Sequence, residues 1–478
     1  MARDSQSALI ALNRFGFGAR GGAAGDLVNA ASDPRGFVKA ELSRPNAALL
    51  EVPGLQSTPA LAEAAFAYQA QLKQAREMAA KAPSKTPEDG NANAAMAASE
   101  PMQPNAATSQ PLNIIQKTYR AEALARLQRA VIADCGFTER LVAFWSNHFC
   151  ISANKGELAR MWAGSFEREA MLGRFADMLK AVEQHPAMLF FLDNQQSLGP
   201  DSRAGQTRKR GLNENLAREI MELHTLGVGG GYSQQDVTSL ARIITGWTFA
   251  GRQGQLGTPG SFVFNANAHQ PGSQQLLGKI YGDAGVAQGE AALADLARHP
   301  FTAKFIATKL ARHFVADEPP APLLARLQQV FGNSDGDLKK VTAALLDSDE
   351  AWKAPLTKLR SPYEFLVAAG RLLARIPEDP ALYLNGLNQL GQPLWAPAGP
   401  NGFPDTNAAW AAPEGMKLRL DISAQLASRV VGNIEPRDLL ELVVGEAASA
   451  ETRQAIERAE TRQQALALLL MSPEFQRR

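Results

Sequence analysis

Cysteine is almost missing from this chain, which has only Cys135 and Cys150 among its 478 residues. The two flank a segment whose pattern predicts one continuous helix, and a rise of about 1.5 Å per residue would hold them roughly 20 Å apart. A disulfide needs Cα atoms within about 7 Å, so we expect free thiols and no disulfide framework. Free thiols favour a reducing compartment.

Long apolar runs and an excess of charge of one sign are also missing. No window approaches the roughly 18 uninterrupted apolar residues of a membrane-spanning helix, and the N-terminus lacks the pattern of a cleaved signal. The absent leader favours the cytoplasm, with export to the periplasm bound to a partner as the open alternative. Lys and Arg number 49 and Asp and Glu number 48, so no overall field attracts nucleic acid.

Three common active-site motifs are absent as well. The chain has no phosphate-binding loop, no dinucleotide glycine fingerprint and no Gly-x-Ser-x-Gly elbow. A nucleophile pair of Cys150 and His148 is disfavoured, because residues two positions apart point in different directions. The sequence therefore excludes the commonest nucleotide-binding and α/β-hydrolase signatures.

Apolar residues are abundant, at 45% of the chain, and most follow helical periodicity. We expect a mainly α fold, a large multi-helix bundle-like domain with a small β-hairpin excursion. Residues 1–80 form an N-terminal helical segment that we expect to pack with the main helical domain, residues 113–478, as one core. Between them, residues 81–112 are rich in Pro, Ala, Asn and Ser and predict a flexible insertion.

Several element boundaries have recognisable signals. Ser233 followed by Asp236 predicts a capping box, and Asn213 predicts the cap of the helix ENLAREIMELHTLG. Alternating Phe262 and Phe264, followed by QQLLGKIYG, predict a hairpin over residues 261–281. In the C-terminal half we expect helices at 287–298, 301–315, 322–331, 337–347, 361–375, 413–431, 435–443 and 452–471.

The densest cluster of charged side chains lies on the predicted helix after Asn213. At 100° per residue, Arg218, Glu219 and Glu222 share one face of that helix. Two interpretations stay open: a solvated face braced by i,i+4 pairs, or carboxylates turned toward a cleft as acid–base groups, with Arg218 as electrostatic support. A zinc motif on this helix alone is excluded if the helix is regular, because Glu222 and His224 would point about 200° apart.

His148, in the segment FWSNHF, lies on an apolar helix face and has two interpretations. It is either a core histidine bonded to a backbone carbonyl or a functional group. In the functional interpretation, His148 and His269 join Glu219 and Glu222 as ligands of a divalent metal. One or two histidines with carboxylates suit Zn, Fe or Mn, and helical bundles can hold such sites.

Blocks spread over nearly the whole chain resemble one known family. They are ALNRFGFG, ERLVAFWSNHF, NENLAREIMELHTLGVGGGYSQQDV, ARIITGW, HPFTAKFIATKLARHFV, GQPLWAP and MSPEFQ. In this order they resemble the uncharacterised bacterial family called domain of unknown function 1800. The resemblance implies a mostly helical fold and, often, a neighbouring partner that resembles sulfatases or alkaline phosphatases and carries a twin-arginine export signal. The chain departs from the usual family form at His224, where an aromatic residue is common, and at Phe403, where Trp is common.

Three functions are therefore open. The first is a metal-dependent enzyme with the cleft of His and Glu residues described above. The second is a non-enzymatic companion or scaffold for the exported sulfatase-like or phosphatase-like partner. The third is a carbohydrate-active protein whose aromatic side chains stack on sugar rings beside Glu219 or Glu222. The tryptophans considered for that stacking are Trp145, Trp247, Trp395 and Trp410.

Overall fold

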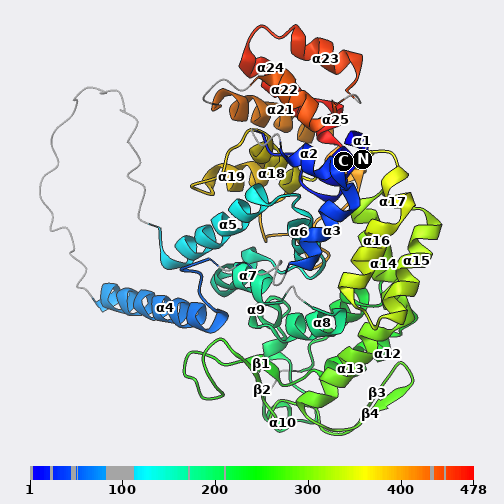
Figure 1. The fold of residues 1–478 in the computed structure, drawn as a ribbon. Coiled ribbons are helices and arrows are strands. Elements are labelled where there is room, and N and C mark those ends of the chain that lie inside the picture. The colour runs from blue at the N-terminus through cyan, green and yellow to red at the C-terminus, as the bar shows by residue number, and fades with distance from the viewer. Residues whose placement is uncertain are drawn as a thin grey trace, which may run out of the picture.

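The computed structural model describes residues 4–21, 25–44, 50, 52–81, 112–170, 173–208, 211–430, 435–445 and 448–478. Apart from its end residues, the insertion predicted at 81–112 lies outside the described residues. Within those ranges the protein is mainly α-helical with two small two-stranded sheets, as predicted (Figure 1). Within the same ranges, no helix has the length and apolar character to cross a membrane.

Most of the N-terminal and central helices lie in the middle of the molecule, and the long N-terminal helix over Thr58–Lys81 extends to the left (Figure 1). The N-terminal helices are α1 (Ser5–Ile10), α2 (Gly25–Ser32), α3 (Pro34–Ser43) and α4 (Thr58–Lys81), with a π-helical turn η1 (Ala11–Phe15) after α1. The central helices are α5 (Ile114–Ile132), α6 (Phe137–His148), α7 (Glu157–Ala170), α8 (Phe175–Gln184) and α9 (Pro186–Phe191), with 3₁₀ turns η2 (Ala153–Lys155) and η3 (Asn194–Gln196).

Two groups of elements follow along the chain: several short elements, and then a set of helices that we call the side wall. The shorter elements are α10 (Arg203–Thr207), α11 (Asn215–Glu219), the π-helical turn η4 (Ile220–His224) and α12 (Gln234–Ile243). The side wall contains α13 (Val286–Arg298), α14 (Pro300–Phe314), α15 (Ala321–Asn333), α16 (Leu338–Asp347) and α17 (Asp349–Lys353).

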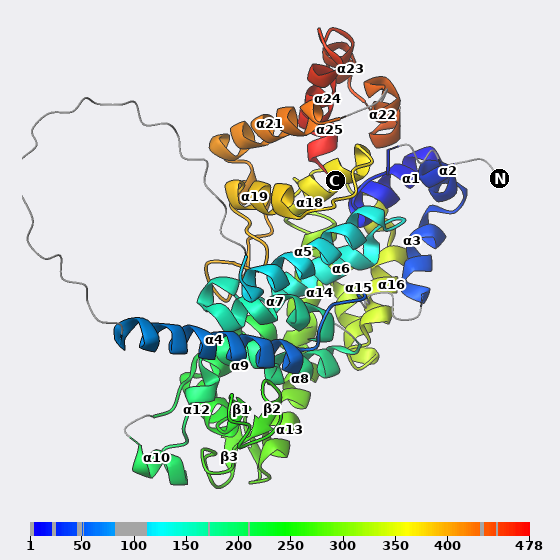
Figure 2. The ribbon, with the colours of Figure 1, turned by 90° about the vertical axis from the view of Figure 1, so that its left-hand side faces the viewer.

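The last helices form a layer above α5 and α7, which Figure 2 shows from the side. They are α18 (Pro362–Leu372), α19 (Ala381–Gln389), α20 (Asn407–Trp410), α21 (Pro413–Ser428), α22 (Pro436–Val443), α23 (Ala450–Glu457), α24 (Arg462–Met471) and α25 (Pro473–Gln476). The single helix predicted at 452–471 is wrong. The chain turns between α23 and α24, and the side chain of Thr461 caps the new helix by accepting from the Gln464 amide.

Two of the predicted caps have different outcomes. Ser233 and Asp236 form the predicted capping box of α12. Asn213 accepts from the amide of Asn215, but Glu214 occupies the N-cap position of α11. The Asn213 side chain also donates to the carbonyls of Leu192 and Asp193, so it holds the entry of the helix against the preceding chain.

The small sheets pair differently from the single hairpin predicted over 261–281. Strand β2 (Phe262–Phe264) pairs antiparallel with β1 (Trp247–Phe249), which follows α12 directly. Strand β3 (Gln274–Leu276) pairs with β4 (Lys279–Tyr281) in a separate hairpin. The alternation of Phe262 and Phe264 did indicate a strand, but its partner is set by the packing of Trp247 in the core, where this side chain is fully buried.

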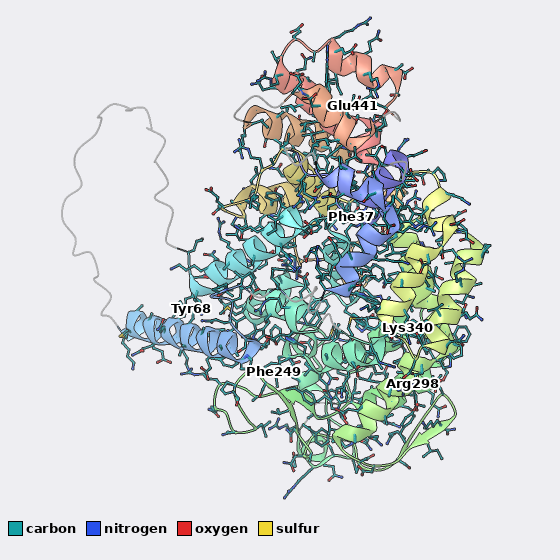
Figure 3. All side chains as sticks on the ribbon, in the orientation of Figure 1. Phe37, Tyr68, Phe249, Arg298, Lys340 and Glu441 are labelled. Atoms are coloured by element: carbon teal, nitrogen blue, oxygen red, sulfur yellow. The ribbon has the colours of Figure 1, made fainter. Side chains whose placement is uncertain are left out.

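Two main hydrophobic clusters form the core. The larger cluster joins Phe15 of the N-terminal segment to Trp162 of α7 and Phe314 of α14. The second cluster joins Leu127 of α5 to Phe365 and other residues of the C-terminal layer. Side chains fill the space between the helices, with Glu441 in the upper layer and Arg298 and Phe249 in the lower part of the molecule (Figure 3).

Candidate functional site

A cavity of about 320 Å³ lies where α6, α14, the start of α18 and the loop 392–406 meet. Much of its wall is aromatic, with Phe144, Phe166, Tyr363, Trp395 and Phe403 among the lining residues. Phe144, Phe166 and Trp395 belong to the larger hydrophobic cluster and Tyr363 belongs to the second. The cavity therefore lies at the boundary between the two parts of the core.

Helix α6 supplies one wall of the cavity through its last turn. Phe144, Asn147 and His148 all line the cavity, because positions three and four apart lie on one face of a helix. The helix begins after Gly136, whose φ of +87° lets the chain turn sharply out of the preceding loop. It ends at His148, so this side chain and the loop that follows both face the cavity.

The loop 392–406 forms the opposite wall. It is held in place by side chains of α6 and of the segment that follows α6. Asn147 accepts from the Phe403 amide at 2.7 Å and donates to the Phe403 carbonyl at 2.9 Å. Ser152 donates to the carbonyl of Pro397, at 2.9 Å. At Gly402, φ is +71° and a Cβ would lie 2.5 Å from the carbonyl oxygen of Asn147, so only glycine fits.

Each acidic side chain that lines the cavity has cationic partners. Arg140 and Arg478 flank Glu364, with nitrogen–oxygen distances of 2.9 Å each. Burial would raise the pKa of Glu364, but Arg478 and Arg140 hold it well below its usual range. Glu167 contacts Arg126 at 2.5 Å. These buried acids are ion-paired and do not serve as free bases.

The third acid, Asp405, is paired with His313. His313 Nδ1 lies 2.7 Å from Asp405 Oδ2, and Lys358 Nζ lies 3.1 Å from Asp405 Oδ1. On its other side, His313 Nε2 accepts from the Arg140 guanidinium at 3.2 Å, since arginine can only donate. Burial lowers the pKa of His313, so the ring is neutral and both of its nitrogens are engaged.

Two cations in the wall, by contrast, have no carboxylate partner among the described residues. They are Lys309 and Arg312, both on α14 and both lining the cavity. Lys309 Nζ donates to His148 Nδ1 at 2.9 Å, and Arg312 Nε donates to the carbonyl of Asp317 at 3.1 Å. Burial, with Arg312 nearby, lowers the pKa of Lys309 to about 8.

His148 connects Lys309 to the end of the η4 turn. Its Nε2 lies 3.2 Å from the carbonyl oxygen of His224, which can only accept, so the network assigns the proton to Nε2 and a lone pair to Nδ1. Burial, with Lys309 beside it, lowers the pKa of His148 well below its usual value. The ring is therefore a neutral acceptor aimed at Lys309, which is close to the core-histidine interpretation of the sequence.

Cys150 lines the same cavity but is a poor nucleophile. Its thiol donates to the carbonyl of Pro400 at 3.2 Å, and burial raises its pKa to about 12. Cys135 is buried too, and both cysteines are free, as predicted. A reactive cysteine needs a lowered pKa, so thiolate chemistry is not supported here.

The charged helix predicted after Asn213 is interrupted, and this changes where its side chains point. Helix α11 ends at Glu219 and the π-helical turn η4 follows, with the Thr225 hydroxyl donating to the carbonyl of Ile220 at 2.6 Å. The assumption of a regular helix was therefore wrong. His224 Nδ1 instead meets Glu183 Oε1 of α8 at 2.8 Å, in a pair that is almost fully buried. The sequence did not indicate this pair.

The predicted catalytic carboxylates lie on this element, outside the cavity lining. Glu219 is half-buried and burial raises its pKa, while Glu222 is half-buried on η4. Arg218 contacts Glu214 at 3.4 Å in an i,i+4 pair and donates to Gln234 at 2.9 Å. A catalytic role for the three residues stays a prediction.

The four predicted metal ligands are not gathered by the described part of the chain. His269 Nδ1 donates to the carbonyl of Thr245 at 2.8 Å, and its Nε2 is buried without a hydrogen-bond partner there. His148 has both nitrogens engaged. In the described residues no group of three or more His, Cys, Asp or Glu has the arrangement to hold a metal ion. Metal binding by His148, His269, Glu219 and Glu222 stays a prediction.

Sequence reasoning missed Lys309 and Arg312, which have no carboxylate partner in the described part of the chain, and the wall that faces them. Lys309 lies four positions before His313 in KFIATKLARHF, and a helical wheel would have placed both on one face. No sequence signal shows that Lys309 and Arg312 lack a carboxylate partner among the described residues. Of the tryptophans considered for sugar binding, Trp145, Trp247 and Trp395 are all buried in the core, and Trp395 also lines the cavity. The fourth, Trp410, donates from Nε1 to the carbonyl of Pro404 at 3.0 Å.

Comparison with known proteins identifies a family whose function is unknown. The model of the family described as "Protein of unknown function (DUF1800)" matches residues 10–477. The matched range contains α6, α14, α18 and the loop 392–406. No curated protein and no solved structure matches the chain.

Proposed function

Since the chain belongs to the DUF1800 family of proteins of unknown function, we propose its function from its own side chains: the cavity binds a small organic anion. The observation that carries this proposal is the unequal pairing of charge in the cavity wall. Glu167, Glu364 and Asp405 each have a cationic partner, which for Asp405 is Lys358, whereas Lys309 and Arg312 have no carboxylate partner among the described residues.

Lys309 and Arg312 are half-buried. A cation that is largely removed from water without a counterion is costly, and a ligand can supply the missing charge. Charged groups in protein interiors are usually paired, because removing them from water costs several kcal/mol per ion. Lys309 and Arg312 are three positions apart on α14, so their side chains lie side by side. A carboxylate or phosphate between them would satisfy both, with charge-assisted hydrogen bonds from the guanidinium and the ammonium.

The rest of the wall fits an apolar ligand body. A cavity of about 320 Å³ lies at the lower end of the range of small-molecule sites, roughly 300–1,000 Å³. The aromatic side chains of Phe144, Phe166 and Trp395 line it. We therefore favour a carboxylic acid with an aromatic or branched aliphatic group over a highly hydroxylated ligand.

Calorimetric titration with phenylacetate tests the proposal. We expect binding to the unmodified protein, at least tenfold weaker binding to Lys309→Met and to Arg312→Met, and little binding of the neutral phenylacetamide. Lys304→Met is the matched control, because Lys304 is an exposed lysine on the same helix outside the cavity lining. Equal affinity for the acid and the amide, or no effect of either cavity variant, would contradict the proposal.

The functions inferred from the sequence remain separate predictions. A metal-dependent enzyme would have to engage His148 and His269 in a different arrangement from the one described above. A scaffold for an exported sulfatase-like or phosphatase-like partner would use surfaces other than the cavity wall with Lys309 and Arg312. The same holds for a carbohydrate-active protein. Elemental analysis of the purified protein and of His148→Ala and Glu219→Ala variants tests the first of these: metal lost in both variants would support it.

A further inference from the structure

We propose that Lys309 forms an imine with its ligand, so that the ligand class is an oxo acid whose carboxylate contacts Arg312 and whose carbonyl carbon reaches Lys309 Nζ. This inference rests on the proposed function and narrows it from organic anions to carbonyl-bearing ones. It also assigns a chemical step to a side chain that neither the sequence motifs nor the family description singles out.

The contacts of Lys309 differ from those of the neighbouring buried lysine. Lys358 Nζ donates to Asp317 Oδ1 at 2.8 Å, to the Asp405 carbonyl at 2.8 Å and to Asp405 Oδ1 at 3.1 Å, so its three hydrogen-bond positions are used. Lys309 Nζ has one polar partner among the described residues, the neutral His148 ring, and it borders the cavity. Lys309 is therefore placed to meet a ligand, whereas Lys358 is a structural cation.

The surroundings of Lys309 also favour the neutral amine, which is the nucleophilic form. Burial lowers its pKa to about 8 from an ordinary value of 10.5; Cys150 and Asp405 oppose this shift, and Arg312 adds a smaller lowering effect. Desolvation beside another cation is a known way of activating a lysine toward carbonyl groups.

The step needs no cofactor and no oxidant. The amine lone pair of Lys309 attacks the carbonyl carbon, the carbon–oxygen π bond breaks, and a carbinolamine forms after a proton moves from nitrogen to oxygen. Loss of the hydroxyl group as water then gives the carbon–nitrogen double bond. One amine and one carbonyl become one imine and one water, with no net change in oxidation state.

His148 is placed to carry the proton in this sequence. Its Nδ1 lone pair lies 2.9 Å from Lys309 Nζ and can accept the proton that the nitrogen releases on attack. The bond from Nε2 to the carbonyl of His224 holds this tautomer and orientation. His148 can pass this proton to the oxygen, which forms the carbinolamine hydroxyl, and can then carry the second proton of the nitrogen to that hydroxyl as it leaves as water. His148 is therefore a positioning and proton-carrying residue, and Lys309 is the group that touches the ligand.

Reductive trapping tests the inference on the full chain. The protein is incubated with phenylpyruvate and sodium cyanoborohydride, and the adduct is located by intact-mass and peptide mass spectrometry. We expect one reduced adduct per chain on Lys309, formed at least tenfold faster than on any other lysine. We also expect the adduct to be absent from Lys309→Met, retained in Lys304→Met, and slowed by phenylacetate, which has the acid group but no ketone.

The outcomes separate this inference from the proposed function. Binding of phenylacetate that depends on Lys309, without a reduced adduct on Lys309, would overturn the imine and leave the anion site standing. Absence of binding by both acids would overturn both. Adducts spread evenly over the exposed lysines would show ordinary surface amines and would also overturn the imine. Circular dichroism melting of Lys309→Met shows whether the variant is folded. If it is folded, loss of the adduct is due to loss of the lysine and not to unfolding.

Discussion

The ammonium group of Lys309 has no carboxylate partner among the described residues, so its cost to the folded state should depend on pH. Its pKa is lowered to about 8 in the folded protein, from an ordinary value of 10.5. Between these two values the unfolded chain binds more protons than the folded one, and stability rises with pH over such a window. Below about pH 8 both states carry the charge, and the full cost of burying it remains.

The direction of this pH dependence gives a first prediction, which urea denaturation can test. The free energy of unfolding of the unmodified protein should increase, relative to that of Lys309→Met, as the pH is raised from 8 to about 10. Taking the difference between the two proteins removes the titration of groups that they share. Lys304→Met serves as a control for loss of a surface lysine, and it should follow the unmodified protein. A constant difference between pH 8 and pH 10 would contradict the lowered pKa.

A second prediction concerns His148 and separates proton transfer from packing. In His148→Asn, the amide oxygen can still accept a hydrogen bond from Lys309 but cannot take a proton from it. We expect trapping of phenylpyruvate to slow at least tenfold, which corresponds to about 1.4 kcal/mol, while phenylacetate affinity changes less than threefold. If both measurements fall by the same factor, His148 only packs against Lys309.

At the scale of single elements, the chain changes from the α-helix α11 to the π-helical turn η4 at Ile220. A regular helix would have left His224 on the apolar face inferred from the sequence, without an identified acid partner. The π-helical turn widens the backbone and brings His224 to Glu183 of α8, in a pair with side chains at most 1% exposed. Such turns are uncommon and need compensating contacts, which here include the bond from Thr225 to Ile220.

A third prediction follows for this buried pair. Replacing His224 by Phe leaves the Glu183 carboxyl buried without its partner, and removal of one member of a buried pair costs about 3 kcal/mol or more. The double variant Glu183→Leu and His224→Phe should recover much of that loss. Urea denaturation of the two single variants and the double variant measures the coupling; strictly additive losses would contradict it.

The loop 392–406 gives a fourth prediction, with a control in the same region. Gly402 and Gly391 both have positive φ, +71° and +79°, but a Cβ at Gly402 would lie 2.5 Å from the carbonyl of Asn147, whereas at Gly391 it would meet nothing within 4 Å. Both alanine variants should therefore show backbone strain of about 1 kcal/mol. Only Gly402→Ala should also displace the cavity wall and weaken phenylacetate binding.

Calorimetry and thermal melting of the two variants check this expectation. Weakened binding in Gly402→Ala with intact binding in Gly391→Ala would support a wall fixed by Asn147. Equal losses of binding in the two variants would show that strain anywhere near the loop is sufficient, and would contradict a specific role for the contact between Gly402 and Asn147.

At the scale of the whole molecule, the cavity lies between two hydrophobic clusters. A buried ion pair connects the parts of the molecule that contain these clusters. Arg140 of α6, in the middle of the molecule, contacts Glu364 at the start of α18, in the C-terminal layer. Glu364 is also part of the capping box of α18, with Ser361. The same acid therefore fixes the start of a helix and links the two layers on either side of the cavity.

A ligand in that position should stabilise both layers together, which is the fifth prediction. A ligand at about 100 times its Kd adds roughly 2.7 kcal/mol to the stability of the form that binds it. Hydrogen exchange with saturating phenylacetate should slow in α6, α14, the start of α18 and the loop 392–406 at once. Slowing confined to one of these segments would place the ligand elsewhere.

Local patterns in the sequence determined much of the secondary structure and little of the candidate site. Helical periodicity, the capping box at Ser233 and Asp236 and the separation of the two cysteines each depend on residues close together in the chain, and each led to a confirmed prediction. Likewise, His148 could be placed on an apolar face from its neighbours alone, because side-chain direction on a helix follows from spacing.

Only the tertiary structure decided which side chains meet at the cavity. Lys309 reaches His148 across 161 positions, and Asn147 holds Phe403 across 256. At His224 the structure has a π-helical turn where the sequence predicted a regular helix, and β2 pairs with a different strand from the one predicted. The physical reason is that a side chain's availability depends on the groups packed around it: Lys309 and Lys358 are alike as residues, and the fold surrounds one with carboxylate and carbonyl oxygens and leaves the other facing a cavity.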